Sequence, residues 1–202
     1  MAPSFCIDLG EPEKLRLLGI ARQSIESGLN GGNMLRLDGQ QLNGMLAAQL
    51  GTFVTLTRNE ELRGCMGTLE SSDPLAHTVV SCAFNAAFRD PRFAQLNSSE
   101  IADTRIEISV LSQMEPFAVT DRENLLSQLR PHVDGLQLED GHYRSTFLPK
   151  VWEKIGAPRE FLQQLLIKAG LSFDYWSETI RFQRYQTISF GEMDFIPVHG
   201  PE

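Results

Sequence analysis

A cysteine, an arginine and two glycines lie within one short apolar stretch, LRGCMGTLE at residues 62–70. In an extended chain alternate side chains share a face, so Arg63, Cys65 and Gly67 are expected on one side of a strand. Side chains two positions apart lie about 7 Å from each other, within reach of a guanidinium, and a nearby positive charge favours a thiolate. The spacing predicts that Cys65 is a nucleophile or a redox-responsive thiol activated by Arg63.

The two glycines of this stretch, Gly64 and Gly67, have no side chain to shield the backbone. We expect that a ligand could approach there and accept hydrogen bonds from exposed N–H groups. A packing interpretation stays open, because an isolated cysteine is commonly a small core residue and glycines also permit a bulge in a curved sheet. In that interpretation Arg63 pairs with a carboxylate.

A second polar motif, RDPRF at residues 89–93, follows a helical pattern. Asp90 is predicted to hold this loop rigid beside a cleft, and Arg92 can recognise a carboxylate or phosphate through two parallel hydrogen bonds. Alternatively, Asp90 only ends the helix. Glu107, on the polar face of an expected strand, is either the partner of one of the two arginines or a solvated side chain. The candidate ligand-binding residues are Gly64, Gly67, Asp90, Arg92 and Glu107.

Charge and cysteine content limit the possible functions. The 202 residues include 18 Lys and Arg against 26 Asp and Glu, a net charge of -8, which disfavours binding to nucleic acid or an anionic membrane. No window approaches the roughly 18 apolar residues of a membrane span, and the N-terminus lacks a secretory pattern. Cys6, Cys65 and Cys82 form no CxxC pair, and the four histidines have no zinc-ligand spacing. We therefore expect a cytoplasmic protein without a metal, cofactor or disulfide framework, in which Cys82 packs in the core.

The elements that position these residues alternate between helical and extended patterns. In the first half we expect a helix over 11–27 stopped by Gly28, a hairpin of strands 52–57 and 62–69, a helix from Pro74 to about Phe88, and a strand over 105–111. These follow from apolar periodicity, β-branched content and capping residues.

In the second half, Asp140-Gly141 predicts a two-residue hairpin turn that sets Glu139 opposite His142. Short helices are expected after Asp121, Pro149 and Pro158, and a last strand over 180–190. Tight turns require antiparallel pairing, so the fold class is α+β. The chain length suits one domain, or two packed subdomains.

Several short motifs occur in a fixed order: GTFVTL at 51–56, LRGCMG at 62–67, PLAHTVVSCAFNAAFRDPRF at 74–93, EISVL at 107–111, DGLQL at 134–138 and FLPKV at 147–151. Over about residues 15–190 the chain thereby resembles the AMMECR-type domain family, whose microbial members are also called AmmeMemoRadiSam system protein A. The hexapeptide carries Met66 at a position where the family has a branched residue, and Lys150 stands where the family has glutamine.

The resemblance implies an α+β fold with one strongly curved, mainly antiparallel, barrel-like sheet, surrounding helices, and the hexapeptide beside a cleft. It also implies genomic company with a Memo-like protein and a radical-SAM enzyme, which are therefore the expected partners. It does not imply a reaction. Two functions stay open: a cysteine-dependent enzyme or enzyme subunit, and a non-catalytic module that binds an anionic small molecule or a partner protein.

Overall fold

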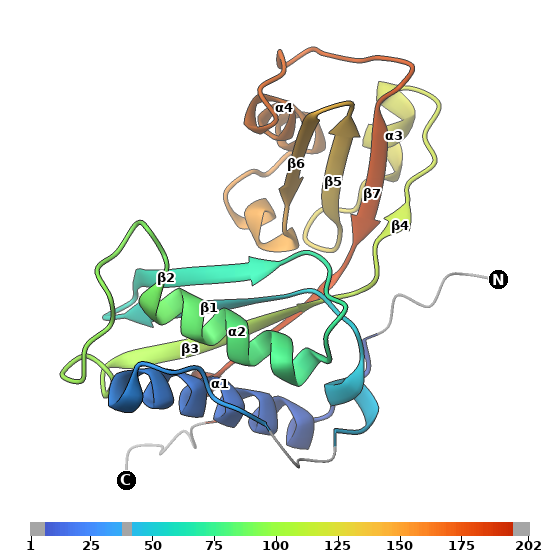
Figure 1. The fold of residues 1–202 in the computed structure, drawn as a ribbon. Helices are drawn as coiled ribbons and strands as arrows, with labels where there is room; N and C mark the ends of the chain where they lie inside the picture. The colour runs from blue at the N-terminus through green and yellow to red at the C-terminus, as the bar shows by residue number, and fades with distance from the viewer. Residues whose placement is uncertain (1–6, 38–41, 196–202) are drawn as a thin grey trace, which may run out of the picture. The chain divides into compact units, whose positions relative to one another are not determined.

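The computed structural model describes residues 7–37 and 42–195. These residues divide into two compact units: a large unit, 7–37, 42–111 and 188–195, and an inserted unit, 112–187. Each unit is built on its own open four-stranded sheet, in the orders β2-β1-β3-β8 and β4-β7-β5-β6 (Figure 1). The α+β class and the mainly antiparallel pairing are confirmed. The strands form two sheets where one was expected, so "barrel-like" describes them only loosely.

The division between the sheets falls inside a segment whose pattern reads as one strand. The elements concerned are β7 (Arg181–Tyr185) and β8 (Thr187–Gly191), the former in the inserted unit's sheet and the latter in the large unit's sheet. Gln186, between them, exchanges hydrogen bonds with Ser112 at 2.9 and 3.0 Å. The chain therefore leaves the large unit and returns to it at the same place, where Ser112 and Gln186 are hydrogen-bonded to each other.

The first helix is longer than its sequence pattern predicts. Helix α1 runs over Glu11–Gly31 and ends at Gly32, whose φ of 68° is left-handed and whose N–H donates to Gly28 O. Gly28 is thus inside the helix, and the expectation that it stops α1 is wrong. A Cβ at Gly28 would clash with the ring of Phe88, so this glycine permits close helix packing.

The strands and second helix of the large unit are β1 (Thr52–Arg58), β2 (Glu61–Thr68), α2 (Leu75–Phe88) and β3 (Thr104–Leu111), with short 3₁₀ helices η1 (Gly44–Ala47) and η3 (Glu192–Phe195). The expected hairpin of β1 and β2 is confirmed: Asn59 and Glu60 turn the chain with φ of 51° and 66°, values required by the tight turn whose twist matches that of the strands. Pro74 precedes the first turn of α2, as expected.

The core of the large unit lies on one face of its sheet. Side chains of that face, such as Val54, Leu56 and Ile108, are fully buried among residues of α1 and α2. Alternation along the strands sends Phe53, Thr55 and Glu107 to the opposite face. Both helices consequently cover the same side of the sheet (Figure 1).

The inserted unit contains β4 (Glu115–Pro116), α3 (Arg122–Gln128), β5 (Gly135–Asp140), β6 (Tyr143–Phe147), η2 (Pro149–Glu153), α4 (Pro158–Lys168) and β7. Asp121 caps α3 as expected, accepting a hydrogen bond from Asn124 N at 2.8 Å. In the core of this unit, Leu136 and Leu138 of β5 pack with residues of α3 and α4, such as Phe161. The ring of Phe161 stacks on that of Trp152, with ring centroids 3.9 Å apart.

The hairpin of the inserted unit turns one residue later than predicted. Asp140 pairs with Tyr143 and Glu139 with Arg144, so the turn is Gly141-His142 and the expected pairing of Glu139 with His142 is wrong. The physical reason is the side chain of Asp140, which accepts hydrogen bonds from three hydroxyls of the segment 175–179. Those bonds hold Asp140 in the strand, and Gly141 takes the left-handed position, with φ of 59°.

Gly64→Ala is predicted to destabilise the large unit. A Cβ at Gly64 would clash with the carbonyl oxygen of Ala86 in α2, and backbone cannot move aside as a flexible side chain can, so we expect a loss of about 2 kcal/mol or more. Urea unfolding would measure the change. Gly19→Ala in α1 is the matched control, because nothing lies within 4 Å of the new methyl group, and it should stabilise by about 0.5–1 kcal/mol. Equal stability of both variants would contradict the packing role of Gly64.

Candidate functional site

The outer edge of β2 is closed by side chains from the loop after α2. Cys65 donates its N–H to Asp90 Oδ2 at 2.9 Å, and its carbonyl oxygen accepts from Arg92 Nη2 at 3.2 Å. Arg92 also pairs with Asp90 through Nε and Nη2, at 2.9 and 2.7 Å. The two side chains thus bond to the edge of the strand as another strand would, and we call this arrangement the Asp90–Arg92 clamp.

The Asp90 carboxylate is saturated by the clamp. It is almost completely buried, and its two oxygens accept four hydrogen bonds, three from Arg92 and one from Cys65. The hydrogen bonds from the Arg92 side chain are the largest cause that lowers the pKa of Asp90 well below its usual range, and backbone N–H groups add to this against the effect of burial. Asp90 is therefore an anion that fixes the backbone at Cys65.

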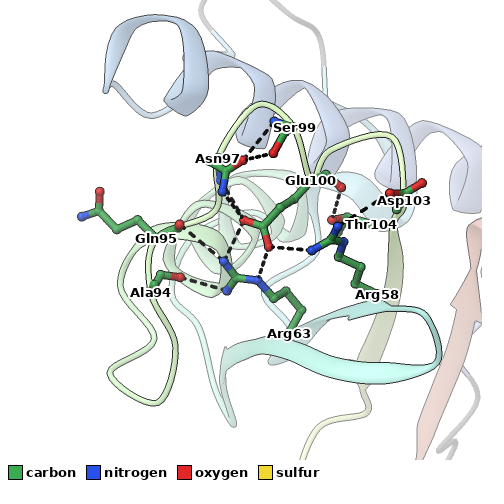
Figure 2. Close-up of polar contacts among 9 residues, drawn as sticks. All are labelled: Arg58, Arg63, Ala94, Gln95, Asn97, Ser99, Glu100, Asp103 and Thr104. Carbon is green, nitrogen blue, oxygen red and sulfur yellow. Dashed lines mark hydrogen bonds and ion pairs between the residues drawn. The ribbon is translucent and has the colours of Figure 1, made fainter.

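Arg63 is committed to a different carboxylate, that of Glu100. Because Leu56 pairs with Gly64 and Thr57 with Leu62, Arg63 is the extra residue of a β-bulge, which re-aims its side chain. Its Nε and Nη2 bind the two oxygens of Glu100 at 2.9 and 3.0 Å. The other contacts of the guanidinium go to the same stretch of chain between α2 and β3, as Figure 2 shows. They are hydrogen bonds to the carbonyl oxygens of Ala94 and Gln95, at 2.9 and 3.4 Å.

The carboxylate of Glu100 accepts hydrogen bonds from three residues. Besides Arg63, it accepts hydrogen bonds from the backbone N–H and the side-chain amide of Asn97, at 3.1 and 2.9 Å, and from Arg58 at 3.4 Å (Figure 2). The hydrogen bonds of Arg63 are the main cause that lowers the pKa of Glu100 to about 2, and burial opposes them. The Arg63–Glu100 pair therefore anchors the segment between α2 and β3 to β2.

The sulfur of Cys65 lies on the sheet face opposite the helices. Cys65 pairs with Thr55, and Thr55 pairs with Glu107, so the three side chains form a row across β2, β1 and β3. Thr55 Oγ1 lies 3.4 Å from the sulfur and can donate to it. Strand spacing places Glu107 about 10 Å from Cys65 along this row. The thiol is half-buried, with a hydroxyl donor beside it.

The cation near the Cys65 sulfur is Arg92. The Asp90 carboxylate is the first cause that raises the pKa of Arg92, and the Cys65 side chain adds smaller contributions. The side chain of Arg92 is 53% exposed, whereas that of Arg63 is 15% exposed. Arg92 is therefore the more accessible of the two motif arginines, and activation of Cys65 by Arg63 stays a prediction.

Both motif glycines have packing roles. At Gly64 a Cβ would collide with Ala86 O, and at Gly67 it would overlap the ring of Phe53 and the carbonyl oxygen of Thr52. Gly64 is buried and Gly67 is exposed. The close neighbours of these glycines come from the protein's own α2 and β1, and a contact with a ligand stays a prediction.

The structure brings most of the predicted site residues together in one unit. Cys65, Asp90 and Arg92 are in contact, and Glu107 lies in the same row as Cys65. Arg63 lies next to them in sequence, but its carboxylate partner is Glu100, which sequence reasoning missed. Thr55 was also missed, because the two-residue turn alone would set it opposite Gly64 and the bulge at Arg63 shifts it opposite Cys65.

Other sequence expectations concern residues outside this site. Cys82 is buried, at 6% exposure, and burial raises the pKa of its thiol to about 11. Cys6 lies outside the described residues. Within 7–37 and 42–195, no three His, Cys, Asp or Glu side chains gather in a way that could hold a metal ion. No helix of the same residues has the length and apolar character to cross a membrane.

Fold and site define a class of α+β proteins in which an antiparallel sheet has its cysteine-bearing edge strand closed by an Asp–Arg clamp. The crystal structure of an uncharacterised protein from Pyrococcus horikoshii is similar, with a TM-score of 0.79 at 30% identity, over 88% of this chain and 90% of that one. A protein of Methanothermobacter thermautotrophicus is 37% identical over 186 residues, 91% of this chain and 96% of the relative. A protein of Sulfolobus acidocaldarius is 35% identical over 195 residues, 93% and 83% of the respective chains.

The family model described as AMMECR1 matches residues 18–190. The chain therefore belongs to the AMMECR1 family, as the order of its motifs predicted. The matched residues include parts of both units.

Glu100→Gln is predicted to remove stability in a pH-dependent way. The folded pKa of Glu100, about 2, is below its ordinary value of 4.5, so its ionised form stabilises the fold above pH 4.5 and this contribution is lost as the pH falls toward 2. We expect the variant to be about 1–3 kcal/mol less stable than the wild type at pH 7. The difference should shrink steadily from pH 4.5 to 2.5 in urea unfolding. A difference that is constant over that range would refute the ion-pair role.

Proposed function

We propose that Cys65 is the reactive residue of a cysteine-dependent enzyme or enzyme subunit, with Arg92 as its neighbouring cation. The observation that carries this proposal is the position of the sulfur on the sheet face opposite the helices, beside the Thr55 hydroxyl, in a residue whose backbone oxygen binds the half-exposed Arg92 guanidinium. A thiolate is the nucleophilic form of cysteine, and hydroxyl donors and cations are the kinds of neighbour that serve reactive cysteines in general. The clamp supports the proposal because it fixes the backbone from which the sulfur projects.

The chemical step that suits this geometry is nucleophilic displacement at carbon. The thiol gives up its proton, and a sulfur electron pair forms a bond to an electrophilic carbon of the substrate. The leaving group departs with the electrons of its broken bond and takes up a proton. Arg92 can hold an anionic group of the substrate beside the sulfur, since guanidinium binds carboxylates and phosphates. Glu107 is a candidate to accept the proton through Thr55 or water.

A second candidate function is non-catalytic binding of an anionic molecule. The observation that favours it is the Nη1 nitrogen of Arg92, for which no hydrogen bond is found among the described residues, on a side chain that is 53% exposed. In this case Cys65→Ser would keep ligand binding and Arg92→Gln would lose it. Arg63→Ala cannot separate the two functions, because it removes the anchor of the 94–104 segment.

The partners implied by the family resemblance are part of the proposal. We infer that the chain works with a Memo-like protein and a radical-SAM enzyme in the cytoplasm, and that Cys65 acts on a small molecule or on a product of one of them. Co-expression with both proteins, followed by affinity purification of this chain, tests the association. Recovery of neither partner, with the wild type and with Cys65→Ser, would remove them from the proposal.

The reactivity of Cys65 is predicted to be high and to depend on Arg92. We expect iodoacetamide to modify Cys65 at least tenfold faster than the buried Cys82 at pH 7, as read by peptide mass spectrometry between pH 5 and 9. Arg92→Gln should slow the reaction several-fold at pH 6–7, because the thiolate loses its nearest cation, and Arg92→Lys should keep more of the rate.

The control for this experiment is Arg36→Gln, which removes one exposed arginine elsewhere in the large unit. It should leave the labelling of Cys65 unchanged. If Cys65 reacts as slowly as Cys82, or if Arg92→Gln and Arg36→Gln have the same effect on its labelling, the thiol is a packing residue. Binding by Arg92 then becomes the leading function.

A further inference from the structure

The inserted unit has a pocket on the side of its sheet that faces away from its core. Leu136 and Leu138 of β5 point into the core formed with α3 and α4, so alternation sends their neighbours to the other face. A pocket of about 430 Å³ lies there. Its polar lining comes from β5, β7 and the segment before β7, and consists of Gln137, Glu139, Thr179, Arg181 and Gln183.

The most informative of these side chains is Gln137. It is only 1% exposed, and its Nε2 donates to Gln183 Oε1 at 2.9 Å. Its own Oε1 is buried and accepts no hydrogen bond from the described residues. A buried acceptor without a donor is costly, and in native proteins such groups call for a specific explanation. Because Gln137 lines the pocket, a ligand N–H that enters the pocket can supply the missing donor.

The charges of the pocket narrow the class of ligand. Glu139 pairs in register with Arg181 of β7 and with Arg144 of β6, and in the described part of the chain its carboxylate has no hydrogen bond or ion pair. Arg181 is held at the rim by Nη1, which donates to the carbonyl oxygens of Glu178 and Ile180 at 2.9 and 3.0 Å. A simple anion would meet the carboxylate of Glu139, and a simple cation would meet the guanidinium of Arg181.

A molecule with both charges can give Glu139 and Arg181 each an opposite charge and give Gln137 Oε1 a donor. We propose that the inserted unit binds a small zwitterion of the α-amino-acid class. Its ammonium group donates to Gln137 Oε1 and to the Glu139 carboxylate, and its carboxylate accepts from Arg181. The volume of the pocket leaves room for a side chain. This site lies wholly in the inserted unit and is independent of the chemistry at Cys65.

Titration of the ¹⁵N-labelled full chain with each of the twenty common L-amino acids tests the proposal. We expect at least one to bind with Kd below about 10 mM and to shift amide signals of residues on β5 and β7. Putrescine, which has only amines, and succinate, which has only carboxylates, should each bind at least tenfold more weakly. If no amino acid shifts these signals at 20 mM, or if putrescine or succinate binds as tightly, the proposal is overturned.

Variants connect the binding to the residues. Glu139→Gln and Gln137→Met should each weaken the amino acid at least tenfold, whereas Glu153→Gln, which changes an exposed carboxylate outside the pocket, should not. Gln137→Met removes an unpaired buried acceptor but also the donor to Gln183 Oε1, so we expect the variant to stay folded with little net change in melting temperature. Unfolding of Gln137→Met, combined with unchanged binding in Glu139→Gln, would show that Gln137 is structural and overturn the assignment. Labelling of Cys65 is unaffected by either result.

Discussion

The edge of β2 is the constraint on which the large unit depends. An edge strand leaves a row of N–H and C=O groups unpaired, and this protein pairs those of Cys65 with side chains of the loop that follows α2. The loop reaches the edge because α2 packs directly on the strand, at a glycine where any side chain would collide with Ala86 O. Gly64 therefore permits the close contact between β2 and the last turn of α2, and the loop that follows α2 brings Asp90 and Arg92 to the strand.

The same constraint explains why a motif that looks chemical is largely architectural. Arg63 and Asp90 read as catalytic or ligand-binding residues, yet each saturates a partner within the fold. The Arg63–Glu100 pair fixes the chain between α2 and β3, and the Asp90–Arg92 clamp fixes the backbone of Cys65. The proposed chemistry therefore rests on the half-buried sulfur of Cys65 and the exposed part of Arg92, with Glu107 as the candidate proton acceptor.

Much of the fold could be predicted from local sequence signals, because alternation, turn residues and helix caps act over a few residues. The β1–β2 hairpin, α2 and the face of β3 follow from such signals. Glu100 could not be predicted as the partner of Arg63, since 37 residues separate them and a bulge redirects the arginine. The strand pattern over 180–190 gave no sign that the chain changes sheets at Gln186. The late hairpin turn could not be predicted either, because the hydroxyls that hold Asp140 in β5 come from residues 175–179.

Two kinds of buried polar group occur among the described residues: carboxylates whose oxygens the protein itself satisfies, and single atoms, such as Gln137 Oε1, that it leaves without a partner. Asp90 and Glu100 are strongly acidic carboxylates whose oxygens accept four or more hydrogen bonds from the protein itself, so a ligand could add little to them. Gln137 in the inserted unit is buried just as deeply and keeps an acceptor unpaired. Because an unpaired buried group destabilises the fold, its presence beside a pocket is better explained by a donor that arrives with a ligand than by a role in folding. The carboxylates of Asp90 and Glu100 therefore support the backbone around Cys65, and the unpaired amide oxygen of Gln137 is the observation on which the proposed amino-acid site rests.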